Sequence, residues 1–109
     1  MTGVQTCALP IYAIERFEEA VAKASGCAYA VGVNSGTDAL TIGMRALGLG
    51  PGDEVITPPN SFIASTATIV NVGATPVFAD VLPDQNIDPE AVAAAISPRT
   101  KAKIGRAHV

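Results

Sequence analysis

The chain has 109 residues, of which 49% are hydrophobic and 16% charged, and its net charge is −3. This length accommodates one domain or part of one, and the apolar content excludes a disordered chain. The negative charge argues against a nucleic-acid partner, and no apolar run approaches the ~20 residues that span a bilayer. Two cysteines and one histidine provide no metal-ligand spacing, so we expect no metal site.

The elements predicted along the middle of the chain alternate between helices and strands. In chain order they are a helix around residues 14–25, a strand at 28–33, a helix at 37–47, a strand at 54–57, a helix at 61–72, a strand at 76–81, a helix at 89–96 and a strand from about residue 101. The helices are indicated by apolar residues three or four apart, such as Leu40, Met44 and Leu47, and the strands by short runs with little charge. Asp88 and Pro89 have the pattern of an N-cap followed by proline at the first helical position.

Strands separated by helices require crossover connections. We therefore predict an α/β fold with a mainly parallel sheet covered by helices. Ligands of such sheets bind beyond the carboxyl ends of the strands. Three predicted loops form that edge, at residues 34–37, 58–62 and 80–88.

The two ends of the chain resemble translated sequencing-library adapter. Residues 1–11 show neither helical nor strand periodicity and lack the features of a signal peptide. The DNA sequence ATCGGAAGAGCACACGTC encodes Ile104–Val109, and its reverse complement, in a shifted frame, encodes Thr6–Pro10. We therefore expect residues 1–12 and 103–109 to be adapter-derived tails and residues 13–102 to be the biological sequence. The alternative is that both ends are native.

The first loop connects the predicted strand at 28–33 to a helix. Gly36 allows a phosphate to approach the backbone, and the helix N-terminus offers N–H donors and a partial positive charge. Ser35 and Thr37 add hydroxyl donors. From the residues alone, two interpretations stay open, a phosphate-binding loop and an ordinary capped turn. The glycine-rich residues 48–52 follow a helix instead of opening one, so they predict a structural turn and no dinucleotide site.

The second loop precedes the third helix, which Asn60 or Ser61 can cap. Phe62 follows them, and its ring can stack on a flat cofactor ring or pack in the core. In the third loop Asp80 can orient a ligand or cap the loop. Cys27 has no histidine partner, and we expect it to be a buried, unreactive thiol.

Five ordered blocks of the sequence carry a resemblance to a known family. They are residues 30–40, 47–56, 73–78, 87–90 and 98–102. With this spacing, residues 13–102 resemble the DegT/DnrJ/EryC1/StrS family of sugar aminotransferases. The resemblance implies that the chain is a fragment of the large domain of the aspartate-aminotransferase (type I) fold, the domain that binds pyridoxal 5′-phosphate (PLP).

The resemblance also implies a cofactor, a reaction and an assembly. Gly36 and Thr37 match positions that receive the PLP phosphate, and Phe62 matches the aromatic position that stacks on the pyridine ring. Family members mostly transfer an amino group from glutamate or glutamine to a keto group of a nucleotide-linked sugar, for example in polysaccharide biosynthesis. The loop at residues 57–62 looks closest to members that act on UDP-linked 4-keto amino sugars. The implied parent protein is a cytoplasmic homodimer.

The family's lysine that forms the Schiff base with PLP matches no residue of this chain. Lys101 belongs to the last matched block and Lys103 to the predicted tail. We therefore expect no catalytic residue here and an inactive fragment. Two alternatives stay open: a sugar dehydratase of the same family, in which histidine replaces that lysine, and a non-catalytic phosphate-binding or regulatory protein with this fold.

Overall fold

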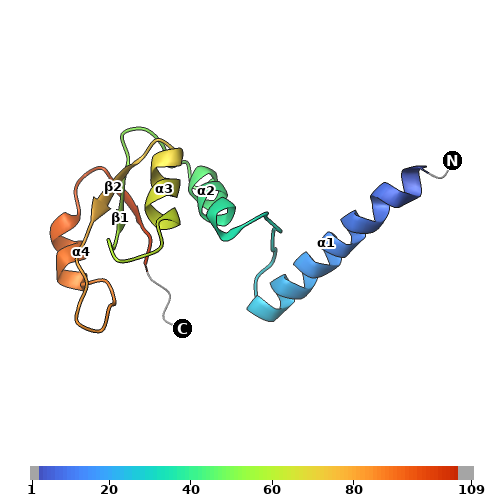
Figure 1. Cartoon of the computed structure of the whole chain (residues 1–109), viewed down its shortest axis with the longest axis horizontal. Helices are drawn as coiled ribbons and strands as arrows, with labels where there is room; N and C mark the ends of the chain where they lie inside the picture. Colours follow the sequence, from blue (N-terminus) through green and yellow to red (C-terminus); the bar gives the residue numbers. More distant parts are fainter. Residues whose placement is uncertain (1–2, 106–109) are drawn as a thin grey trace. The chain divides into compact units, whose positions relative to one another are not determined.

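The computed structural model describes the backbone of residues 3–105 and the side chains of residues 12–105. The chain divides into two compact units, Met1–Asn34 and Ser35–Val109. The elements, labelled in Figure 1, are α1 (Gly3–Ser25) in the first unit and α2 (Gly36–Ala46), β1 (Glu54–Thr57), α3 (Ala64–Asn71), β2 (Thr75–Phe78), α4 (Pro89–Ala95) and β3 (Thr100–Lys103) in the second. No helix within residues 3–105 is long and apolar enough to cross a membrane.

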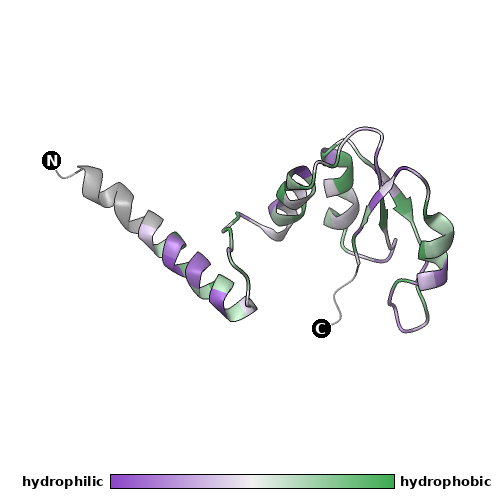
Figure 2. Cartoon of the chain, turned by 180° about the vertical axis from the view of Figure 1, so that it is seen from behind, coloured by the Kyte–Doolittle hydropathy of each residue, from purple (hydrophilic) through white to green (hydrophobic). Residues whose placement is uncertain are grey.

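The first unit consists of α1 and the extended segment that follows it. The helix begins at Gly3, although residues 1–11 lack helical periodicity, because a helix extends from an existing turn more easily than it nucleates. Figure 2 shows hydrophilic residues on several turns of α1. The apolar side chains that predicted this helix, among them Ile14 and Phe17, are exposed.

The predicted strand at residues 28–33 is wrong. These residues form no regular element and pair with no strand of the described chain. Instead, the Gly32 N–H donates a 2.6 Å hydrogen bond to Oε1 of Glu18, which ties the segment to α1. Tyr29 and Val31 are 87% and 77% exposed. An apolar run becomes a strand only where a neighbouring strand satisfies its backbone groups, and no strand of the described chain does so here.

The second unit contains a parallel sheet with the strand order β2-β1-β3, which confirms the predicted parallel topology. The register of β1 with β2 runs from Glu54 opposite Thr75 to Thr57 opposite Phe78. The strand predicted at 76–81 therefore ends early. Beyond Phe78 the chain leaves the ladder, and Val81 forms an antiparallel bridge with Ile87.

The core of the second unit lies where α2 and α3 meet and α3 covers the sheet. In Figure 2 hydrophobic residues gather on α3 and on the strands. The buried residues of this core are Met44, Leu49, Val55, Ile69 and Ala74. Leu47, predicted to share the apolar face of α2, is 78% exposed because the helix ends one residue earlier and Leu47 is its C-cap.

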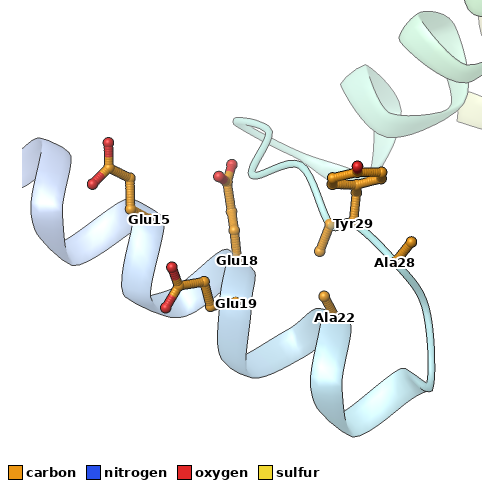
Figure 3. Close-up of a pocket in the computed structure, with 7 residues that line it drawn as sticks. Glu15, Glu18, Glu19, Ala22, Ala28 and Tyr29 are labelled. Atoms are coloured by element: carbon orange, nitrogen blue, oxygen red, sulfur yellow. The ribbon is translucent and has the colours of Figure 1, made fainter.

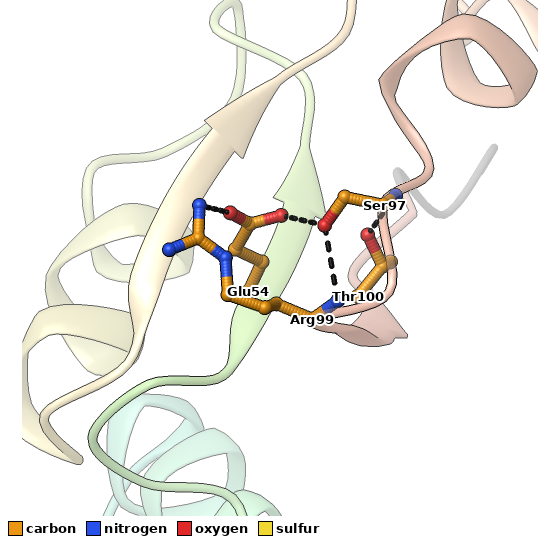
Figure 4. A network of polar contacts seen from close by, with 4 residues as sticks. All are labelled: Glu54, Ser97, Arg99 and Thr100. Carbon is orange, nitrogen blue, oxygen red and sulfur yellow. Dashed lines mark hydrogen bonds and ion pairs between the residues drawn. The ribbon is translucent and has the colours of Figure 1, made fainter.

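A polar cluster joins the start of β1 to the turn before β3 (Figure 4). The buried Glu54 carboxylate accepts a hydrogen bond from Ser97 Oγ through Oε2 and pairs with Arg99 through Oε1. The Glu54 N–H also donates to the carbonyl of Arg99 at 2.8 Å. The hydroxyl of Thr100 accepts from the Ser97 N–H and closes the turn. This cluster fixes β3 beside β1.

Candidate functional site

The N-termini of α2 and α3 lie at the carboxyl edge of the sheet. The two helices pack against each other, and Gly73, just after α3, lies against Pro51, in the loop after α2. A Cβ on Gly73 would be 3.1 Å from Cγ of Pro51. Since both loops enter the sheet at the amino ends of β1 and β2, the helix N-termini lie at the opposite edge (Figure 1). The second unit thus places the start of α2 on the edge where α/β sheets bind ligands.

Gly36 and Thr37 are the first residues of α2. Ser35 is the N-cap, and its Oγ accepts a 3.0 Å hydrogen bond from the N–H of Asp38. This confirms a capped turn, which leaves the N–H groups of Gly36 and Thr37 without helical acceptors. Gly36 has no positive φ, and a Cβ built on it meets no atom within 4 Å. The described chain therefore gives no reason of its own for a glycine at this position.

Phe62 lies in the loop between β1 and α3, at the same edge of the sheet. Its ring is 75% exposed, so the core interpretation of this residue is wrong. The predicted caps of α3 are also wrong: Ile63 is the N-cap and makes no side-chain hydrogen bond. Ser61 pairs with Ser65 through their hydroxyls, and Asn60 Nδ2 donates to Gln85 Oε1, so both candidate caps have other partners.

The structure also shows the surroundings of Asp80 and Cys27, two further residues that the sequence analysis singled out. Asp80 caps its loop, because Oδ1 accepts a 2.8 Å hydrogen bond from the N–H of Val81. Cys27 is exposed, and the expectation of a buried thiol is wrong. The sequence misplaced it because residues 28–33, which follow Cys27 and were predicted to be a buried strand, form no strand in the described chain.

The first unit contains a hollow of about 200 Å³ beside α1 (Figure 3). Its lining includes the carboxylates of Glu15, Glu18 and Glu19 and the ring of Tyr29. Three carboxylates repel a phosphate, so this hollow is no candidate for an anionic cofactor. Within residues 3–105, no group of three or more histidine, cysteine, aspartate or glutamate side chains is arranged to hold a metal ion.

Sequence reasoning missed two residues at the carboxyl edge. The Thr57 hydroxyl is fully buried and has no hydrogen-bond partner in the described chain. Gln85 adopts a left-handed backbone with a φ of 69°. A threonine in a strand and a glutamine in a loop are ordinary sequence features, and neither residue type signals these environments.

Comparison with known proteins tests the family resemblance. The model of the DegT/DnrJ/EryC1/StrS aminotransferase family matches residues 11–109. The chain belongs to this family. Several curated relatives and solved structures that it resembles carry aminotransferase names.

Two curated relatives illustrate the match. The spore coat polysaccharide biosynthesis protein SpsC of Bacillus subtilis is 49% identical over 92 residues, which cover 84% of this chain and 24% of SpsC. A UDP-N-acetyl-3-dehydro-alpha-D-glucosamine 3-aminotransferase of Acidithiobacillus ferrooxidans is 53% identical over 90 residues, which cover 80% of this chain and 24% of that enzyme. The chain thus spans about a quarter of the length of these relatives.

Solved structures share the fold. DesV of S. venezuelae superposes with a TM-score of 0.81 at 46% identity, covering 84% of this chain and 25% of DesV. NtdA of Bacillus subtilis, solved with bound cofactor PMP (the aminated form of PLP), gives a TM-score of 0.81 at 41% identity and covers 84% of this chain and 21% of NtdA. The predicted α/β fold of the PLP-dependent aminotransferases is therefore confirmed.

Proposed function

We propose that this chain is part of the large, PLP-binding domain of a sugar aminotransferase. In this proposal the parent enzyme is a cytoplasmic homodimer that transfers an amino group from glutamate or glutamine to a keto group of a nucleotide-linked sugar. Residues 13–102 are its biological segment and both tails are adapter-derived. Gly36, Thr37 and Phe62 contact the cofactor.

The observation that carries the proposal is an uncovered aromatic ring at the same sheet edge as a helix N-terminus. Phe62 is 75% exposed there, although burying such a ring stabilises a protein by roughly 1.5–3 kcal/mol. The N-terminus of α2 offers free N–H groups and a partial positive charge. A planar ring that carries a phosphate matches both features, so these residues fit PLP.

Each side chain has a defined task in this proposal. The N–H groups of Gly36 and Thr37 and the Thr37 hydroxyl hold the phosphate, and Gly36 leaves room for it because it has no Cβ. Phe62 covers one face of the pyridine ring and excludes water from it. When bound, PLP supplies an electron sink for the carbon that carries the amino group.

The names of the relatives support the substrate class. One relative is a UDP-2-acetamido-2-deoxy-3-oxo-D-glucuronate aminotransferase, and another is a dTDP-3-amino-3,4,6-trideoxy-alpha-D-glucose transaminase. A third is an L-glutamine:2-deoxy-scyllo-inosose aminotransferase, which supports glutamine as one amino donor. We therefore propose a keto sugar linked to a nucleoside diphosphate as the acceptor.

The substitution Gly36→Ala tests this proposal in the longer protein that contains the chain. We expect the PLP affinity to fall about tenfold, because the new methyl group displaces the phosphate from the N–H donors. The fold should persist, because alanine favours a helix over glycine and nothing in the described chain occupies the space.

The matched control is Gly43→Ala, an exposed glycine of the same helix with equally open space. It should share the gain in helix stability and leave PLP affinity unchanged. Absorbance titration measures the PLP dissociation constant of each variant, and the unfolding temperature of each variant is measured as well. Together these values separate a loss of phosphate binding from a change in helix stability. Equal PLP affinities of Gly36→Ala and Gly43→Ala would contradict the phosphate role of Gly36.

A further inference from the structure

The loop after β2 is a small hairpin that extends from the carboxyl edge of the sheet. Val81 and Ile87 form its bridge, and the Leu82 N–H donates to the carbonyl of Asn86 at 2.8 Å. The Gln85 N–H donates to the carbonyl of Leu82, also at 2.8 Å, and closes the tip. These bonds make residues 81–87 a defined arm and not an open loop.

Gln85 has an unfavourable backbone conformation at the tip of this arm. Its φ is 69°, the left-handed region in which glycine and asparagine are at ease and glutamine is uncommon. The backbone of the turn therefore favours a different residue type. Such a conformation persists where the surroundings impose it, and it is a reason to look for a role of the side chain.

The side chain of Gln85 reaches the loop that carries Phe62. Its Oε1 accepts a 3.0 Å hydrogen bond from Nδ2 of Asn60, 25 residues earlier in the chain. Asn60 lies two residues before Phe62, and its loop has no side-chain cap at the start of α3 to hold it. The bond to Gln85 thus links two loops that leave neighbouring strands at the same edge.

We propose that Gln85 is a positioning residue, whose bond to Asn60 fixes the loop that presents the Phe62 ring to the cofactor. The effect of this bond on the affinity for PLP rests on the proposed function. The fixed loop itself can be measured without any cofactor. A loop held in advance loses less entropy when the ligand binds.

The first experiment measures the loop in the full 109-residue chain. Phe62→Trp gives this sequence its only tryptophan, and the fluorescence anisotropy of Trp reports motion of the loop. In this background Gln85→Gly and Asn60→Ala should lower the anisotropy equally, and the double variant should lower it no further. Pro83→Ala, an exposed residue of the same arm, is the control and should leave the anisotropy unchanged. Unchanged anisotropy in Gln85→Gly, or additive losses in the double variant, would overturn the inference.

The second experiment measures PLP affinity in the longer protein, with Phe62 in place. Gln85→Gly should weaken binding about fivefold, the effect of one hydrogen bond, while the unfolding temperature stays equal or rises because glycine relieves the backbone. If Gln85 had a purely structural role, its substitution would lower both the PLP affinity and the unfolding temperature. An unchanged affinity in a variant with lowered anisotropy would overturn the positioning role. If the unsubstituted longer protein binds no PLP, the proposed function fails, and the anisotropy still decides whether the bond fixes the loop.

Discussion

Thr57 shows at the scale of one residue how this edge differs from an ordinary core. Its hydroxyl is fully buried at the end of β1 and has no hydrogen-bond partner among the described residues. Thr68 is equally buried, but its Oγ1 donates a 2.7 Å hydrogen bond to the carbonyl of Ala64. Burial of a hydroxyl without a partner costs free energy, whereas a satisfied hydroxyl contributes to stability.

We therefore predict opposite effects of the same substitution at these two positions. Thr57→Val should raise the free energy of unfolding by about 1 kcal/mol, because it removes an unsatisfied hydroxyl. Thr68→Val should lower it by about 1 kcal/mol, because it removes a satisfied one. Urea unfolding followed by circular dichroism measures both. A loss of stability in Thr57→Val as large as that in Thr68→Val would show that the Thr57 hydroxyl has a partner.

Single residues of the site were predictable only in part. Gly36, Thr37 and Phe62 were singled out because they lie in loops after predicted strands and match a family pattern. The structure places Gly36 and Thr37 in the first turn of α2 and Phe62 in the loop before α3. Their contacts with PLP remain a prediction. The exposure of Phe62 was not predictable, because the same residue type fills most protein cores and only its surroundings decide its burial.

At the scale of elements, the polar cluster at Glu54 links β1 to the turn before β3 in addition to the hydrophobic contacts of Val55 and Ala102. The Glu54 side chain is 9% exposed and that of Arg99 is 70% exposed, so water screens the ion pair from the arginine side. The hydrogen bond from Ser97 is partly buried. The carboxylate therefore depends more on Ser97 than on Arg99.

We predict a graded loss of stability when this cluster is dismantled. Glu54→Ala should lower the free energy of unfolding by about 2–3 kcal/mol, because it removes charge-assisted hydrogen bonds in a buried place. Arg99→Ala should cost at most about 1 kcal/mol, as expected for an exposed pair. Chemical unfolding of both variants measures the difference. A larger loss in Arg99→Ala than in Glu54→Ala would contradict this order.

Most elements were predictable because their signals are local. The apolar spacing of α2, the N-cap of Asp88 before α4 and the short strand β1 all appear in the structure. Residues 28–33 show the limit of this reasoning. Their apolar run satisfies every local criterion for a strand, but a strand is defined by its neighbour, and sequence patterns do not reveal which neighbours are present.

At the scale of the whole molecule, the chain spans about a quarter of its relatives' length. We propose that the lysine that binds PLP lies outside these 109 residues. We predict that the 109-residue chain does not transaminate. Added PLP should not be converted to its amino form by glutamate faster than free PLP is under the same conditions, as followed by absorbance. A glutamate-dependent spectral change that exceeds the free-cofactor control would contradict this prediction.

The most direct measurement is the DNA sequence of the native locus, read outward from both ends of the segment that encodes residues 13–102. We predict that the native sequence departs from the present chain in both tails. The reading frame should continue beyond residue 102 through a strand that contains an aspartate and then a loop that contains a serine and the PLP-binding lysine. A locus that encodes both present ends and stops after Val109 would contradict the proposal that this chain is part of a sugar aminotransferase.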